Sequence, residues 1–119
     1  MPIDRGQTFA VFFKEVSEHV AKNLDFPHWR RENAGLGFAK TSEWPGESSR
    51  HVQDAARKIL SNPNYVAEWV RWGLSCERTW SPVRLANMMT FYTLGVCLVS
   101  EVTGHEALEP DIAVENPAV

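Results

Sequence analysis

Hydrophobic residues recur at helical spacing along most of this chain, and the stretch from Pro82 to Thr103 is apolar on nearly every side. Ser81 is a favourable N-cap, Pro82 suits the first helical turn, and Gly104 suits the position after the last turn. A helix of this length spans about 33 Å. Because a helix that is apolar all round must be buried by other elements or lie in lipid, the sequence predicts a central helix enclosed by amphipathic neighbours. The alternative is that Pro82 to Thr103 crosses a membrane as a helix whose apolar sequence is interrupted by polar residues.

Three amphipathic segments precede this central helix. Apolar residues recur every three or four positions from Thr8 to Leu24, which predicts a first helix that stops at Pro27. A second helix is expected to begin at Ser48 or Ser49 and to end before Pro63. The third helix is expected to have Asn64 as its N-cap and Gly73 near its end.

The chain between the first two predicted helices, from Pro27 to Gly46, carries the turn residues of a loop. We expect Leu36, Phe38 and Trp44 to hold this loop against the body of the protein. No segment keeps the alternation of apolar and polar residues that is typical of β-strands. The fold class is therefore predicted to be all-α.

Charge is distributed unevenly over the 119 residues. The net charge is −3, and residues 105–119 contribute −4 with no Lys or Arg, so residues 1–104 carry +1. We therefore expect one helical domain over residues 1–104 and an acidic tail over 105–119 without stable structure. A nearly neutral body argues against nucleic acid as a partner, because such binding depends on clustered cations.

Residues with catalytic or metal-binding chemistry are scattered. His19, His28, His51 and His105 form no pair at metal-ligand spacing. We expect no enzymatic activity, no metal, no cofactor and no membrane anchor, and we interpret both cysteines as reduced thiols of a cytosolic or nuclear protein. An enzyme that uses Cys76 as a nucleophile is a remote alternative.

The second predicted helix has unusually small residues, Ala55 and Ala56, in its apolar stripe. Small residues leave room for a partner helix, and Met88 and Met89 of the central helix have the adaptable side chains that suit a groove floor. The competing interpretation is that all of these side chains complete the core.

The chain from the second helix to Val102 resembles the Bcl-2 family of apoptosis regulators, most closely the short, divergent members carried by large DNA viruses such as iridoviruses. The segment Glu68-Trp69-Val70-Arg71-Trp72-Gly73 matches the family motif E-L-F-x-D-G at its Glu and Gly. The run from Arg84 to Phe91 follows the family's central-helix pattern from its arginine, and Thr79-Trp80-Ser81-Pro82 stands near the place of the Asn-Trp-Gly signature.

The chain also departs from the family pattern. The connection between Gly73 and Arg84 is longer, the Asn-Trp-Gly signature is degraded, and the helices that follow the central one in the family have no counterpart. The resemblance therefore implies a Bcl-2-like bundle truncated on its C-terminal side. A missing layer would expose one side of the central helix, so we expect self-association or partial cover by the tail.

The resemblance implies a non-enzymatic, anti-apoptotic function in the cytoplasm of a host cell, with contact to mitochondria through partners. Such proteins hold the amphipathic death-motif helix of Bim-, Bak- or Bax-type partners in a hydrophobic groove, and a ligand aspartate pairs with the arginine that opens the central helix, here Arg84. A homodimerisation module without a peptide groove is the alternative. The expected groove residues are Val52, Ala56, Ile59, Leu60, Val66, Trp69, Val70, Arg84, Met88 and Phe91.

Overall fold

The computed structural model describes residues 5–33, 46–77 and 79–103, and these residues form helices and no strand. The all-α prediction is confirmed for this part of the chain. The predictions for Leu36, Phe38 and Trp44, for Gly104 as a stop residue and for the tail 105–119 lie outside it. The helices are α1 (Arg5–Asn23), α2 (Phe26–Glu32), α3 (Gly46–Leu60), α4 (Pro63–Ser75) and α5 (Pro82–Thr103).

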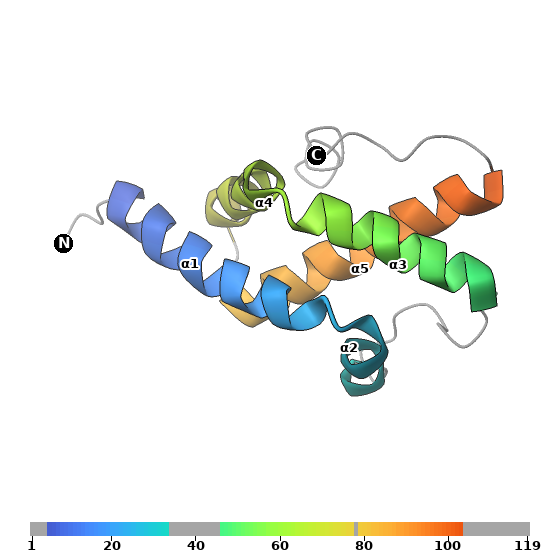
Figure 1. Cartoon of the computed structure of the whole chain (residues 1–119). Helices are drawn as coiled ribbons and strands as arrows, with labels where there is room; N and C mark the ends of the chain where they lie inside the picture. Colours follow the sequence, from blue (N-terminus) through green and yellow to red (C-terminus); the bar gives the residue numbers. More distant parts are fainter. Residues whose placement is uncertain (1–4, 34–45, 78, 104–119) are drawn as a thin grey trace.

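Helices α1 and α3 both pack along α5 and cross in front of it in Figure 1, whereas α4 packs mainly against α1. The beginning of α3 lies beside the end of α5, where His51 Nδ1 is 3.6 Å from Glu101 Oε1. Gly73 allows α4 to approach α5 closely, because a Cβ at this position would lie 2.8 Å from Leu85 Cδ2. The core therefore sits where α1, α3 and α4 meet one side of α5.

The amphipathic patterns correctly identify the buried faces of α1 and α3. Val16 and Val20 of α1 and Val52, Ala56 and Leu60 of α3 are buried. On the opposite face of α1 the charged residues Lys14, Glu15, Glu18 and Lys22 are exposed, as the pattern predicts.

The prediction that Pro27 to Gly46 is loop throughout is wrong from Pro27 to Glu32, because these residues belong to α2 (Phe26–Glu32). Pro27 occupies the first turn of this helix, where its missing N–H removes no intrahelical hydrogen bond. Phe26 and Trp29 are buried against the core, so a short segment that is rich in arginine and proline becomes helical through packing. Trp29 is thus a core residue of this helix.

The N-cap of α4 is Asn62, not the predicted Asn64. The Asn62 Oδ1 atom accepts a hydrogen bond from the backbone N–H of Asn64 at 2.9 Å, and Asn62 has extended backbone angles. Pro63 then takes the first helical position, which it favours. At α5 the predicted N-cap is confirmed, because Ser81 Oγ accepts a hydrogen bond from the Arg84 N–H at 3.2 Å.

Helix α5 is less enclosed than its composition predicts. Leu85, Met89 and Leu94 are buried, but Val83 is 43% exposed and Val99 is 60% exposed. The expectation of enclosure on every side is therefore wrong at these two valines. By length and composition alone α5 is the one described helix that could cross a membrane, with a mean hydropathy of 1.3 over its first 20 residues.

A buried polar cluster joins the ends of α1 and α2 to α5. Asn23 Nδ2 donates hydrogen bonds to Asn87 Oδ1 at 3.2 Å and to Thr90 Oγ1 at 3.1 Å, and Trp29 Nε1 donates to Asn87 Oδ1 at 3.0 Å. Thr90 in turn donates to the Ala86 carbonyl at 2.7 Å. Because buried polar groups are costly unless paired, this cluster fixes how the three helices meet.

An aromatic cluster joins α4 to α5. The Trp69 ring lies edge-on to Tyr65, Trp72 and Tyr92, with centroid distances of 6.5, 5.5 and 5.6 Å. The Tyr65 hydroxyl and Thr93 Oγ1 are 2.8 Å apart. Within the described residues, Trp69 Nε1 is buried and has no hydrogen-bond partner. The contacts that the structure gives for Trp69 are those of its ring.

Candidate functional site

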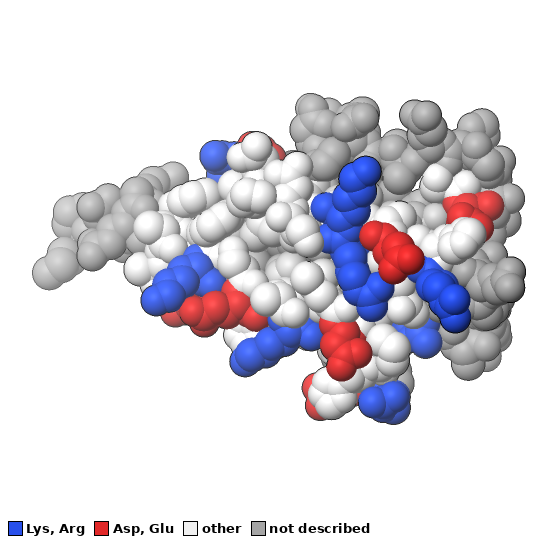
Figure 2. Space-filling model, viewed as in Figure 1, with Lys and Arg blue, Asp and Glu red and all other residues white. Residues whose placement is uncertain are grey.

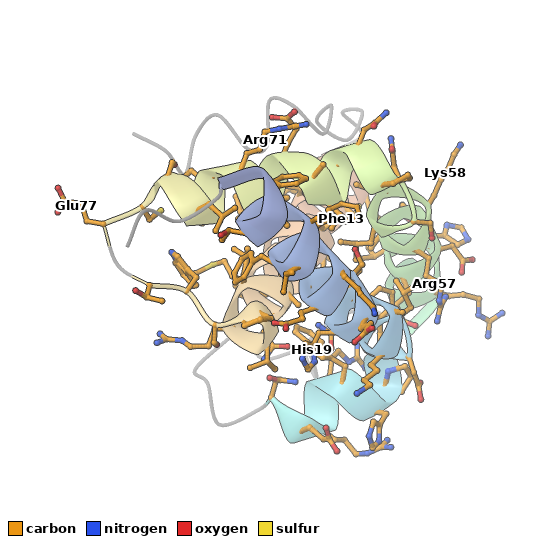
Figure 3. The ribbon with its side chains drawn as sticks, turned by 90° about the vertical axis from the view of Figure 1, so that its left-hand side faces the viewer. Phe13, His19, Arg57, Lys58, Arg71 and Glu77 are labelled. Atoms are coloured by element: carbon orange, nitrogen blue, oxygen red, sulfur yellow. The ribbon has the colours of Figure 1, made fainter. Side chains whose placement is uncertain are left out.

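An apolar groove of about 380 Å³ lies between α1 and the corner at which α3 turns into α4. Its volume falls within the range of typical ligand pockets, about 300–1,000 Å³. Figure 3 shows Phe13 between α1 and α4, with Arg57 and Lys58 extending from α3. The groove is lined by Phe13, Ser17, Val20, Ala21, Leu24, Leu60, Ser61, Pro63 and Val66.

The sequence of α1 explains why a hollow forms here. Ser17 and Ala21 are four residues apart and therefore lie one above the other on the same face of the helix. Their small side chains stand next to larger ones, Phe13, Val20 and Leu24, so the wall of α1 is recessed at the middle. The Asn62 cap turns the chain sharply and places Leu60 and Val66 on the opposite wall.

Cationic side chains border this groove on the α3 side. Figure 2 shows Lys and Arg side chains in a band over the C-terminal half of α3, beside an uncharged surface over α1 and α4. Arg57 is fixed in place, because its Nε donates to the Leu24 carbonyl at 3.1 Å and its Cζ lies 5.1 Å from the Phe26 ring centroid. Its Nη1 pairs with Asp54 Oδ1 at 3.0 Å.

Lys58 differs from Arg57 in that it is exposed. It has no ion-pair partner among the side chains that the structure describes. Arg57 thus lies beside the groove wall at Leu24 with its guanidinium oriented and paired with Asp54, and the exposed Lys58 follows it in α3.

Most of the residues expected to form a groove lie elsewhere. Leu60 and Val66 do line the observed groove, although both are largely buried. Ile59, Met88 and Phe91 are partly buried against the core. Four more are fully buried and complete the core, which was the competing interpretation: Val52, Ala56, Trp69 and Val70. Met89, expected to suit a groove floor, is also fully buried in the core.

Arg84 is exposed and does not line the groove. Its Cζ lies 5.7 Å from the Trp80 ring centroid, and the Trp80 ring lies 5.5 Å from Trp72, near the end of α4. The groove lies at the beginning of α4, where Pro63 and Val66 are found. Trp72 lies six to nine residues beyond Val66 and Pro63, so the structure separates the Arg84 contact from the groove by about 9–14 Å along α4.

Sequence reasoning missed the contribution of α1 to the site. Phe13, Val20 and Leu24 were interpreted only as a core-facing stripe. The signal available in the sequence was the pair of small residues, Ser17 and Ala21, four positions apart beside that stripe. Such a pair forms a recess only if the element that packs opposite leaves the space empty. The structure shows that this element is the α3–α4 corner.

Residues with reactive chemistry do not converge on the groove. No three His, Cys, Asp or Glu side chains in the described ranges are placed to hold a metal ion. Cys76 is half-buried, and its Sγ donates to the Trp72 carbonyl at 3.3 Å, whereas Cys97 is buried in the core. The arrangement offers an apolar contact surface with a cationic edge.

Burial raises the pKa of the Cys97 thiol from 9.0 to about 11. Since the folded chain holds this proton more tightly than the unfolded chain, the contribution of Cys97 to stability is complete below pH 9 and is lost as the pH rises to about 11. We expect the free energy of unfolding to fall less steeply with pH in Cys97→Ala than in the wild type, as measured by urea titrations across this range. Cys76→Ala is the matched control, and equal slopes in all three proteins would contradict the prediction.

No family model, no curated protein and no solved structure matches this chain. The function is therefore argued from the groove and from the residues that surround it.

Proposed function

We propose that this protein is a non-enzymatic, helix-binding protein whose groove between α1 and the α3–α4 corner receives an amphipathic helix. The observation that carries the proposal is the groove itself, which is apolar, is of ligand-binding size and has Arg57 beside it, bound to the carbonyl of the lining residue Leu24. Helix-in-groove recognition requires an apolar surface for anchors at positions such as i, i+3 or i+4, and i+7. A cationic rim adds orientation by pairing with an acidic residue of the ligand.

The proposed partners are the death-motif helices of pro-apoptotic Bcl-2 relatives, of the Bim, Bak or Bax type, and the proposed role is to block apoptosis in the cytoplasm of a host cell. This finer proposal is supported by the resemblance of the sequence to Bcl-2 homologues of large DNA viruses. It also fits the exposure of Arg84 at the beginning of α5. A ligand helix that pairs with Arg84 must extend from the groove along most of α4, over at least about 9–14 Å.

We expect at least one death-motif peptide to bind with a submicromolar Kd in isothermal titration calorimetry. Ala21→Tyr, which fills the groove from an exposed position, is expected to weaken that binding by about tenfold or more, which corresponds to about 1.4 kcal/mol. Ala10→Tyr is the matched control, because Ala10 is also exposed on α1 but does not line the groove. Arg84→Glu is expected to weaken binding by a smaller factor, since an exposed ion pair contributes little.

Failure of a full panel of such peptides to bind the folded protein would contradict the proposed partner class. Equal losses in Ala21→Tyr and Ala10→Tyr would contradict the proposed location. The alternative function, homodimerisation without a peptide groove, is favoured by the exposure of Val83 and Val99 on α5. A dimer in sedimentation that binds none of the peptides would support this alternative.

A further inference from the structure

One residue outside the lining of the groove is bonded to both of its walls. The lining of the α1 wall ends at Leu24, and the opposite wall begins at Leu60 and Ser61, where α3 ends. Arg57 Nε donates a hydrogen bond to the Leu24 carbonyl at 3.1 Å. The Arg57 carbonyl accepts hydrogen bonds from the Ser61 N–H at 2.9 Å and from Ser61 Oγ at 2.6 Å. Arg57 thus joins one wall through its side chain and the other through its backbone.

The hydrogen bond to Leu24 satisfies the end of α1. Leu24 directly follows the last residue of α1, and the last carbonyl groups of a helix have no partner within it. A cation also interacts favourably with the partial negative charge at a helix C-terminus. Arg57 supplies both the donor and the charge from a different helix. The position of Leu24 in the groove wall therefore depends on where α3 holds Arg57.

The guanidinium of Arg57 is itself held in place. Its Cζ lies 5.1 Å from the centroid of the buried Phe26 ring, and its Nη1 pairs with Asp54 Oδ1 at 3.0 Å. Because arginine presents its donors in a rigid planar fork, these contacts fix its orientation as well as its distance from Leu24. A lysine at this position would keep the charge but not this geometry.

A second attachment holds the same end of α1 without Arg57. Asn23 Nδ2 donates hydrogen bonds to Asn87 Oδ1 and Thr90 Oγ1 of α5. Since these hydrogen bonds do not involve α3, we expect α1 to stay docked when the side chain of Arg57 is lost. The docking of α1 and the placement of its groove wall are thus separable.

We propose that Arg57 is a positioning residue that sets the width of the groove, by fixing Leu24 of one wall relative to Ser61 of the other. Its effect on ligand binding rests on the proposed function, whereas its effect on the groove walls does not.

The first test observes the two walls directly by NMR, in the full chain with labelled methyl groups and no ligand. Arg57→Met removes the donors and keeps an unbranched apolar side chain beside Phe26. We expect the nuclear Overhauser effects between the methyl groups of Leu24 and those of Leu60 and Val66 to weaken, because these effects fall steeply with distance. Unchanged effects in a folded Arg57→Met protein would overturn the proposal.

Lys58→Met is the matched control, because it makes the same change of charge at the next residue. Lys58 is exposed and does not line the groove, so we expect the effects between the walls to stay as in the wild type. Equal losses in Arg57→Met and Lys58→Met would overturn the proposal. Arg57→Lys keeps a donor but loses the fork and is expected to give a smaller loss, which also provides the test if Arg57→Met does not fold.

A general loss of stability is distinguished from positioning by Thr93→Val. This change removes the hydrogen bond between Thr93 Oγ1 and the Tyr65 hydroxyl, and neither residue lines the groove. We expect Thr93→Val to be less stable than the wild type while the effects between the walls stay unchanged. If Thr93→Val weakened them as much as Arg57→Met does, the role of Arg57 would be only structural and the proposal would be overturned.

A peptide titration by calorimetry separates this inference from the proposed function. If a death-motif peptide binds the wild type, Arg57→Met is expected to weaken binding by about tenfold or more, because a preorganised surface is lost, and Lys58→Met by a smaller factor. That result supports both.

If the effects between the walls weaken in Arg57→Met but no peptide binds the wild type, the role of Arg57 stands and the proposed partner class fails. If a peptide binds the wild type and the effects do not weaken, the role of Arg57 fails alone. Equal peptide binding by the wild type and Arg57→Met, although the walls have moved, would overturn the proposed location of the ligand in the groove.

Discussion

Replacing Trp69 with alanine is expected to lower the free energy of unfolding by about 3–5 kcal/mol, the range for truncating a fully buried tryptophan. Trp69 is 0% exposed and its ring contacts Tyr65, Trp72 and Tyr92. Removing it leaves a cavity at the junction of α4 and α5, which the neighbouring rings fill only in part. Chemical denaturation followed by far-ultraviolet circular dichroism measures the loss.

Trp69→Phe is expected to cost much less than Trp69→Ala, because it retains an aromatic ring and removes a buried N–H that has no described partner. Trp29→Phe is the matched comparison, since Trp29 Nε1 donates to Asn87 at 3.0 Å and this hydrogen bond is lost. If Trp69→Phe were as destabilising as Trp69→Ala, the indole N–H would have an acceptor, with the Tyr65 hydroxyl as the candidate.

Asn87→Ala is expected to lower the free energy of unfolding by about 1–3 kcal/mol, because it leaves Trp29 Nε1 without an acceptor and removes one of the two acceptors of Asn23 Nδ2. The donors are Asn23 Nδ2 and Trp29 Nε1, which approach Asn87 from α1 and α2. The same denaturation measurement applies. Asn64→Ala, an exposed asparagine on α4, is the control and is expected to change stability by less than about 0.5 kcal/mol.

The two cluster variants also test each other. Since Trp29→Phe removes the donor that Asn87→Ala leaves unpaired, the double variant is expected to lose less stability than the sum of the single variants. Strict additivity would show that Trp29 and Asn87 do not interact in solution.

Helix positions could be predicted from the sequence wherever a stripe of apolar residues was long enough to show its period. This was so for α1 and α3, whose buried residues follow the predicted faces, whereas α5 was predicted from its nearly continuous apolar sequence. Helix α2 escaped prediction because it has seven residues, which is too short for a period, and because Pro27 is equally compatible with a helix end and a helix start. Asn62 and Asn64 are both good capping residues, and only the backbone geometry distinguishes them.

The groove could not be predicted from the sequence in the same way. An apolar residue such as Val70 or Ala56 has the same pattern whether it lines a groove or fills the core, and the structure places both in the core. Whether apolar residues form a groove or a core depends on how closely the two helices that carry them approach each other. That distance is set by side chains on both of them, here Ser17 and Ala21 on one wall and Leu60 and Val66 on the other.

Helix α1 provides one wall of the groove and, through Val16 and Val20, part of the core. Occupancy of the groove is consequently coupled to the global unfolding equilibrium, because a ligand that needs α1 in place binds only the native state. At a free concentration 100 times its Kd, such a ligand raises the unfolding free energy by about 2.7 kcal/mol. The melting temperature of the chain is thus itself a sensor for binding, even for a ligand of unknown identity.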